Sequence, residues 1–130
     1  MPGGGGLSRG RLPEKGIALA LPIAAARGYV TRCIRGRSGA CDIVIHAEEY
    51  TALITVQQLR RLHGTVAEMA FACREQIAKL RLVPAGLCRS LELWVCSPYG
   101  QFRFFRLTPA GLLELGKNGE PPANPGGAGM

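Results

Sequence analysis

The residues that could form a hydrolytic site are Ser38, Asp42, His46 and His63. Ser38 lies in the stretch Gly36-Arg37-Ser38-Gly39-Ala40, which departs from the nucleophile elbow Gly-x-Ser-x-Gly at its last residue. The elbow works because a strand turns sharply into a helix and lifts the serine into solvent. Here a second strand is expected to follow the turn, so we expect the protein not to be an enzyme.

Patterns that bind metals or phosphate-bearing cofactors are also missing. His46 and His63 are seventeen residues apart, and no Cys or His lies at the short spacings of structural zinc sites. The glycine run Gly3 to Gly6 precedes no strand-to-helix unit, so it does not predict a phosphate loop. We therefore expect no metal and no cofactor.

The cysteines indicate reduced thiols. Their number is odd, no two are spaced as Cys-x-x-Cys, and four lie in apolar or strand-like patterns, which favours a cytoplasmic protein without a disulfide framework. Cys33 and Cys41 flank a predicted turn, so one disulfide between them is the alternative in an oxidising compartment. The full set is Cys33, Cys41, Cys73, Cys88 and Cys96.

The basic residues point to a polyanionic partner. The net charge is +7, and residues 1–40 hold seven basic residues against the single acidic Glu14. A basic, flexible leading segment attracts nucleic acid, although a role in solubility alone is the alternative. The predicted phosphate contacts are Arg27, Arg32, Arg35, Arg37, Arg60, Arg61, Arg74 and Arg103.

Aromatic residues gather in the stretch from Ser90 to Gly116, which holds five of the chain's eight aromatic rings. Strand alternation mixes aromatic and arginine side chains on both faces of residues 101–107. Such rings stack on unpaired bases, and packing in the core is the alternative. A second possible function is a protein-interaction module: a homodimer, or a small inhibitor or adaptor of a larger complex. Its predicted interface residues are Phe71, Leu82, Trp94, Tyr99 and Phe105.

One α+β domain over residues 17–117 is expected between two tails that we expect to be disordered. The first tail is the basic, glycine-rich arm 1–16, and the second is the Pro/Gly-rich stretch 118–130. Residues 17–26 predict either a short strand ended by Pro22 or a segment packed over the core. Residues 28–35 and 41–46 alternate in polarity and predict a β-hairpin. Residues 47–62 fit either one helix or a strand followed by a short helix.

A central amphipathic helix is predicted from Thr65 to Leu82. Thr65 and Glu68 have the spacing of a capping box, and apolar residues recur on one face. Phe71, Ala78 and Leu82 form a second apolar stripe, so this helix is expected to be buried on more than one side. A second hairpin follows, with its turn at 98–100, and residues 108–115 predict a short capped helix.

From Thr55 onward the predicted order is short helix, turn, longer helix, two-stranded hairpin and then Arg106-Leu107-Thr108-Pro109-Ala110-Gly111. This order and this motif resemble winged helix-turn-helix DNA-binding proteins over about residues 55–116. The resemblance implies that residues 65–82 contain the recognition helix, that residues 98–101 tip the wing, and that the nucleic acid is DNA.

The apolar run 17–26 follows Arg9, Arg11 and Lys15, as in a cleaved secretory signal, but it contains Pro22 and follows a polyglycine start. No run approaches the roughly 20 apolar residues that a membrane-spanning helix needs. We therefore expect a small, non-enzymatic, cytoplasmic protein that binds nucleic acid and does not contact a membrane.

Overall fold

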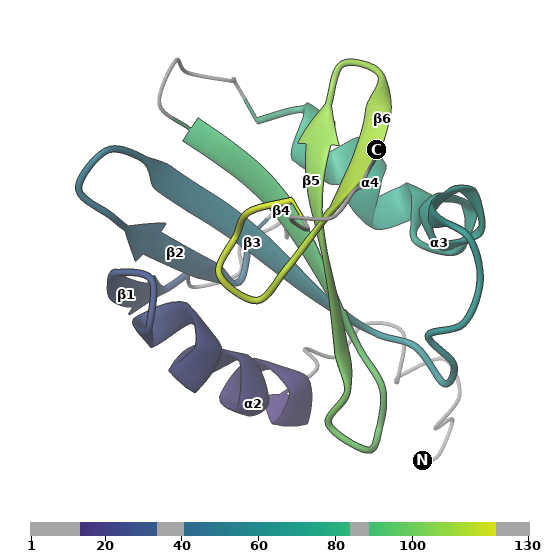
Figure 1. Cartoon of the computed structure of the whole chain (residues 1–130), viewed down its shortest axis with the longest axis horizontal. Coiled ribbons are helices and arrows are strands. Elements are labelled where there is room, and N and C mark those ends of the chain that lie inside the picture. Colours follow the sequence, from purple (N-terminus) through teal and green to yellow (C-terminus); the bar gives the residue numbers. More distant parts are fainter. Residues whose placement is uncertain (1–13, 34–40, 84–88, 122–130) are drawn as a thin grey trace, which may run out of the picture.

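A mixed β-sheet forms the centre of the molecule in the computed structural model, which describes residues 14–33, 41–83 and 89–121. Its six strands lie side by side in the order in which they occur in the chain (Figure 1). Neighbouring strands are antiparallel except for β3 and β4, which are parallel along their full length. The strands are β1 (Tyr29–Arg32), β2 (Ile43–His46), β3 (Thr51–Gln58), β4 (Arg89–Cys96), β5 (Phe102–Thr108) and β6 (Gly111–Leu115).

Helices cover both faces of the sheet. The helix α2 (Glu14–Ala25) packs on one face, whereas α3 (Val66–Ala72) and α4 (Arg74–Arg81) lie on the other (Figure 1). Because parallel strands need a long crossover, α3 and α4 occupy the connection between β3 and β4. The fold class is therefore α+β, as the sequence predicted, with a mixed sheet between two helical layers.

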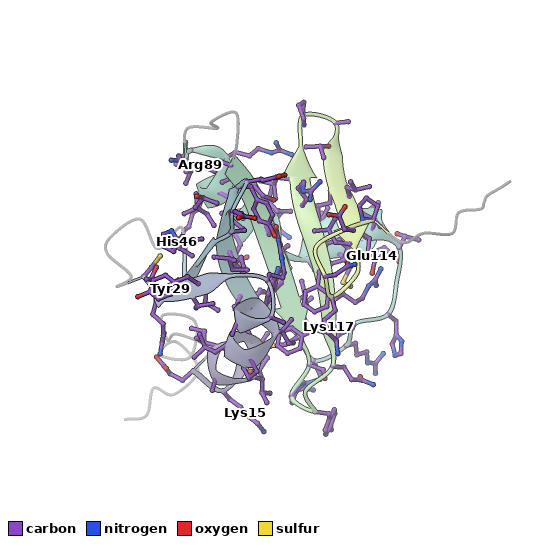
Figure 2. The ribbon with its side chains drawn as sticks, turned by 60° about the vertical axis from the view of Figure 1, so that its left-hand side comes forward. Lys15, Tyr29, His46, Arg89, Glu114 and Lys117 are labelled. Atoms are coloured by element: carbon purple, nitrogen blue, oxygen red, sulfur yellow. The ribbon has the colours of Figure 1, made fainter. Side chains whose placement is uncertain are left out.

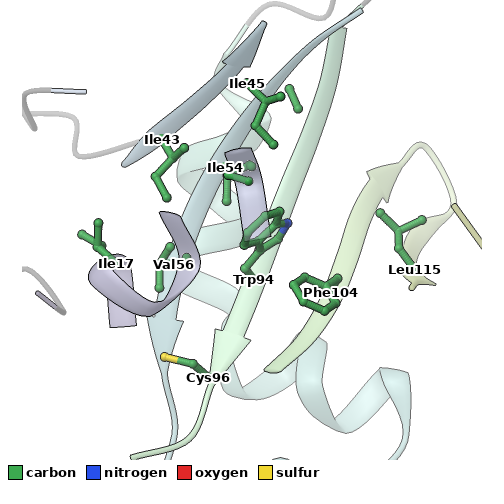
Figure 3. Packing of buried hydrophobic residues seen from close by; sticks show 12 residues of the cluster. Ile17, Ile43, Ile45, Ile54, Val56, Trp94, Cys96, Phe104 and Leu115 are labelled. Atoms are coloured by element: carbon green, nitrogen blue, oxygen red, sulfur yellow. The ribbon is translucent and has the colours of Figure 1, made fainter. Parts of the chain in front are cut away.

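The larger core lies under α2. Ile17, Ala20 and Ala24 of this helix are buried against the sheet, where β2 to β5 contribute isoleucines, a valine and aromatic rings (Figure 3). Trp94 is fully buried, and its ring meets Phe104 edge-on with the ring centroids 4.9 Å apart. A second core forms on the other face, where Met69, Cys73 and Leu80 pack against Leu93, Val95 and Phe105.

Of the two alternatives for residues 17–26, the segment packed over the core is confirmed, and it is a helix rather than a short strand. Ile17, Ala20 and Ala24 recur every three or four residues and all face the sheet, so the helix buries an apolar stripe even though Pro22 lies inside it. The domain also begins earlier than predicted, because Glu14, Lys15 and Gly16 already belong to α2. The structure does not describe residues 1–13.

Of the two alternatives for residues 47–62, the strand forms: residues 51–58 are the strand β3, and within the described stretch 41–83 no helix follows it before α3. Buried and exposed residues do not alternate along this strand: Ala52 and residues 54–56 are buried. The reason is that both faces of the strand are covered by other parts of the domain. A strand covered on both faces loses the alternation that would mark it in a sequence. The short helix that the winged helix-turn-helix resemblance implied before His63 is therefore absent from the described residues.

The central helix is divided in two at Cys73. The capping box predicted at its start is confirmed: the Glu68 amide donates to the Thr65 hydroxyl at 3.1 Å, and the Thr65 amide donates to the Glu68 carboxylate at 2.7 Å. Cys73 has φ −109° and ψ 23°, outside the helical range, and α4 starts at the next residue. Figure 1 shows that α3 and α4 run in different directions on either side of this break.

Residues 111–115 form the strand β6 and not the predicted helix. The Thr108 hydroxyl accepts hydrogen bonds from the amides of Ala110 and Gly111, which is the pattern that an N-cap would also show. Gly111 has φ +141°, a backbone conformation that turns the chain back along β5. The same hydroxyl therefore stabilises a hairpin turn. The helix that the resemblance implied after Thr108 is a strand.

The chain continues past Leu115 into a turn that packs against the sheet. The Gly116 amide donates to the Glu120 carbonyl at 2.7 Å, and Arg106 donates to the Gly119 carbonyl at 3.0 Å. Gly119 is buried with φ +88°, and a Cβ on it would lie 2.5 Å from the guanidinium carbon of Arg27. The described structure thus continues beyond residue 117, and its last turn lies against Arg27, two residues after the end of α2.

Candidate nucleic-acid interface

The turn between β4 and β5 presents an aromatic ring to solvent. The Ser97 hydroxyl accepts hydrogen bonds from the amides of Tyr99 and Gln101 at 3.1 and 3.2 Å, and the Ser97 amide donates to the Gln101 carbonyl. Gly100 adopts φ +88° and completes the turn. This hydrogen-bonded turn leaves Tyr99 86% exposed, the most exposed large hydrophobic side chain in the described residues.

Two arginines lie beside this turn. The Leu59 amide donates to the Cys96 carbonyl at 2.8 Å, so the loop that leaves β3 starts next to the end of β4. Arg60 and Arg61 follow immediately and are exposed. Both the β3–α3 loop and the β4–β5 turn reach the lower end of the sheet in Figure 1.

A lysine from the first helix joins them. Lys15 Nζ donates to the Pro98 carbonyl at 3.3 Å, which brings the start of α2 to the same turn. Figure 2 shows Lys15 at this end and Arg89 at the opposite end of the molecule. We call the group Lys15, Arg60, Arg61 and Tyr99 the arginine–tyrosine end.

The carboxylates that lie nearby in the sequence are already engaged. Glu14 Oε1 lies 3.6 Å from Arg32, and Glu68 Oε1 accepts the Thr65 amide. The arginine–tyrosine end thus has three cationic side chains and one exposed ring. Cations bind phosphates regardless of sequence, and an exposed ring can stack on an unpaired base.

Arg103 was predicted to contact phosphate, but it holds the β3–α3 loop in place. Its guanidinium makes a two-bond ion pair with Glu114 at 2.9 and 2.7 Å and donates to the carbonyls of Leu62 and Gly64 at 2.7 and 2.9 Å. The hydrogen bonds with Glu114 raise the pKa of Arg103, the burial of its side chain opposes that rise, and the Glu114 charge adds to it. Arg103 therefore supports the position of Arg60 and Arg61.

Arg27 was predicted to contact phosphate, and this prediction is wrong because the side chain is buried. Its side chain is 6% exposed and forms an ion pair at 2.9 Å with Glu92, whose side chain is 0% exposed. Burial alone would raise the pKa of Glu92, but the hydrogen bonds and the charge of Arg27, with further donors from Trp94 and Ser90, lower it. Arg27 also donates two hydrogen bonds to the Tyr50 hydroxyl, at 3.1 and 3.0 Å. This cluster is a satisfied part of the core and has no access to a phosphate.

The remaining predicted residues are distributed over the surface and the core. Arg32 is exposed on the edge strand β1, and Arg74 is exposed at the start of α4. Arg35 and Arg37 lie outside the described residues.

The predicted protein-interface residues divide into two groups. Trp94 and Phe105 are fully buried, so their prediction as interface residues is wrong, whereas Phe71, Leu82 and Tyr99 are exposed. Of the predicted phosphate contacts, Arg60 and Arg61 lie in the loop that starts next to the end of β4, the strand that leads into the Tyr99 turn. Lys15 was missed, because its link to Pro98 depends on how α2 packs.

The residues considered for hydrolysis have other partners or stand apart. The Val56 amide donates to Asp42 Oδ2 at 2.8 Å, His46 Nε2 lies 3.1 Å from the Thr31 hydroxyl, and His63 is exposed in the β3–α3 loop. Ser38 lies outside the described residues. No cluster of three or more metal-ligating side chains occurs within residues 14–33, 41–83 and 89–121. None of the helices there is long and apolar enough to span a membrane.

Cysteine chemistry gives a first testable prediction. Cys33, Cys41, Cys73 and Cys96 are free thiols, and burial raises the pKa of Cys73 to about 11. Burial, together with the adjacent Cys33 thiol, raises the pKa of Cys41 well above its usual range. Since only the thiolate is nucleophilic, we expect Cys73 at pH 8 to react with iodoacetamide about two orders of magnitude more slowly than an unfolded cysteine.

The measurement is mass spectrometry of the peptide that contains Cys73, with urea-unfolded protein as the control. Raising the pH toward the elevated pKa should speed the reaction of the folded protein more than that of the unfolded protein, because the unfolded thiol is ionised earlier. Equal rates in the two states at pH 8 would contradict the prediction.

Comparison with known proteins gives no assignment. The chain matches no protein-family model, and no curated protein is significantly similar to it.

Proposed function

We propose that this protein is a non-enzymatic nucleic-acid-binding protein that holds an unpaired strand of DNA or RNA at its arginine–tyrosine end. The observation that carries the proposal is that Tyr99, 86% exposed on a hydrogen-bonded turn, and the exposed Arg60 and Arg61 follow strand ends that are hydrogen-bonded to each other. A ring on a fixed turn loses little conformational freedom when a base stacks on it. The two arginines and Lys15 would bind the phosphates on either side of that base.

The charge of the chain supports the same partner. The net charge is +7, and in the sequence Arg9 and Arg11 come five and three positions before the start of α2, whose first turn carries Lys15. Long-range attraction by such an excess speeds encounter with a polyanion and weakens as salt rises. The way α3 is held also favours single-stranded nucleic acid over insertion of this helix into the groove of a duplex. The first turn of α3 is tied into its capping box, and the helix contributes Met69 to the core beneath it.

The test is fluorescence anisotropy with labelled single-stranded DNA, the same sequence as RNA, and the DNA duplex, each over a range of salt concentrations. The unpaired strands should bind more tightly than the duplex. The double variant Arg60→Glu/Arg61→Glu should bind at least about tenfold more weakly, and its salt slope should fall by about 1.4, the share of two phosphate contacts on a single strand. Tyr99→Ala should weaken binding by about tenfold without changing the slope, because stacking is insensitive to salt.

The matched control is Arg74→Glu/Arg81→Glu, which changes the net charge by the same amount on the α3–α4 side of the sheet. It should lose only the small, general electrostatic attraction. Equal losses in the two double variants would reject the arginine–tyrosine end as the site, and the absence of any binding at low salt would reject the function.

A further inference from the structure

A small apolar pocket lies between α4, the end of α3 and the start of β6. Its volume is about 320 Å³, and its wall is built from aliphatic side chains of Ala70, Ile77, Ala78 and Leu112 together with Gly111. Pockets of this size hold a bulky side chain or a small ligand. The pocket is on the opposite side of the sheet from α2 and does not include the arginine–tyrosine end.

Two arginines flank this pocket. Arg74 and Arg81 both line it and are two helical turns apart on α4, so they rise on the same side of the helix about 10 Å from each other. Each makes one hydrogen bond to a carbonyl of the chain: Arg74 to Phe71 at 2.9 Å, and Arg81 to Thr108 at 3.3 Å. A guanidinium has five N–H donors, so both arginines retain donors for an acidic group.

Exposed apolar side chains extend the surface beyond the pocket. Phe71 is 69% exposed at the α3 end, and Leu82 is 81% exposed just after α4. The Arg74 guanidinium lies over the Phe71 ring, 4.3 Å from its centroid, so one face of that ring is already covered. An aliphatic hollow beside a covered ring suits an inserted side chain better than a stacked base.

We propose that the Arg74–Arg81 pocket binds an acidic amphipathic helix of a partner protein. A bulky apolar side chain of that helix enters the pocket, and carboxylates one turn before and one turn after it pair with Arg74 and Arg81. The occupant is acidic because both charged residues in the wall are arginines, and it is amphipathic because the rest of the wall is apolar. Phe71 and Leu82 add apolar contact at the two ends of the helix. This surface is a second binding function, separate from the nucleic-acid site.

The test uses two synthetic helical peptides with a fluorescent label and the full-length protein. Both carry one central leucine, flanked at one turn on either side by glutamates in the first peptide and by lysines in the second. The wild-type protein should bind the glutamate peptide at least about tenfold more tightly, and Arg74→Glu/Arg81→Glu should reverse this preference. Ala78→Phe should abolish binding of the glutamate peptide, because Ala78 is exposed and a larger side chain there fills the pocket without changing the charge.

Thermal unfolding shows whether each variant remains folded, and Arg60→Glu/Arg61→Glu is the charge-matched control that should keep the peptide preference. Anionic vesicles and single-stranded DNA serve as competitors. Failure of the glutamate peptide to bind, or an equal effect of both double variants, would overturn the proposal. Displacement of the peptide by vesicles or DNA that depends on Arg74 and Arg81 would overturn it in favour of a lipid or nucleic-acid ligand.

Discussion

Replacing Arg27 by alanine is expected to lower the free energy of unfolding by about 3–5 kcal/mol, because it leaves the carboxylate of Glu92 charged and unpaired in the core. Arg27 donates to both carboxylate oxygens at 2.9 Å, and neither side chain has appreciable contact with water. Denaturation by urea, followed through the fluorescence of the single tryptophan, measures the change. Trp94 Nε1 donates to the same carboxylate at 3.0 Å, so its emission reports directly on this cluster.

The double variant Arg27→Ala/Glu92→Gln separates charge from packing. An amide has no charge to bury, and its oxygen can still accept from Trp94 while its NH2 group donates to the Ser90 hydroxyl, so the double variant should be more stable than Arg27→Ala alone. If the two variants were equally unstable, the unpaired charge would not be the cause of the loss.

The loss of stability caused by Arg27→Ala should depend on pH in a definite direction. In the wild type the pKa of Glu92 is lowered below the ordinary 4.5, so its contribution to stability is present above that value and is lost as the pH falls through the lower folded value. In Arg27→Ala the buried carboxyl has no cation, which raises its pKa and favours the protonated form. The difference in stability between the two proteins should therefore shrink as the pH falls from the raised pKa of the variant, above 4.5, to the lowered pKa of the wild type, and a constant difference would contradict the assignment.

Replacing Arg103 by alanine should cost about 2–3 kcal/mol and should also weaken nucleic-acid binding without removing a phosphate contact. Hydrogen bonds to a charged group are individually strong, and Arg103 makes four of them, to Glu114 and to the carbonyls of Leu62 and Gly64. Their loss releases the β3–α3 loop, so Arg60 and Arg61 no longer stand in one position beside Tyr99. Urea denaturation and anisotropy with single-stranded DNA measure the two effects.

Arg103→Lys is the matched control, because it keeps the charge but not the planar fork that reaches a carboxylate and two carbonyls at once. Its stability should lie between those of the wild type and the alanine variant. A lysine variant with the stability of the wild type would show that charge, and not the geometry of the four bonds, holds the loop. An alanine variant with a normal salt slope but lower affinity is the expected signature of a positioning residue.

Local signals in the sequence were sufficient for only some elements. The capping box at Thr65 depends on residues three apart, and it forms as predicted. The strand β3 was one of two alternatives, and the sequence could not decide for it because neighbours on both faces remove the polarity pattern that marks a strand. Thr108 and its hydroxyl bonds fit a helix start and a hairpin turn equally well, and the positive φ of Gly111 decides between them.

The candidate site combines a local pattern with distant contacts. Adjacent arginines at 60 and 61 are visible in the sequence, but their neighbour Tyr99 is brought beside them only by the parallel pairing of β3 with β4. Arg27 looks like any other basic residue until Glu92, which follows it by sixty-five positions, is placed next to it by the sheet. Such pairings leave no trace in spacing or composition.

The turn at Gly119 links the two ends of the domain. Because Arg27 occupies the space where a side chain at Gly119 would lie, and Arg106 holds the carbonyl of that glycine, the first helix and the last turn are completed together. During synthesis on a ribosome, the N-terminal helix emerges long before this turn, and the cluster around Glu92 stays open to water until residue 119 has left the exit tunnel. A product that stops short of Gly119 would therefore lack the turn that packs against Arg27, and it would present an unfinished core to the quality-control machinery of the cell.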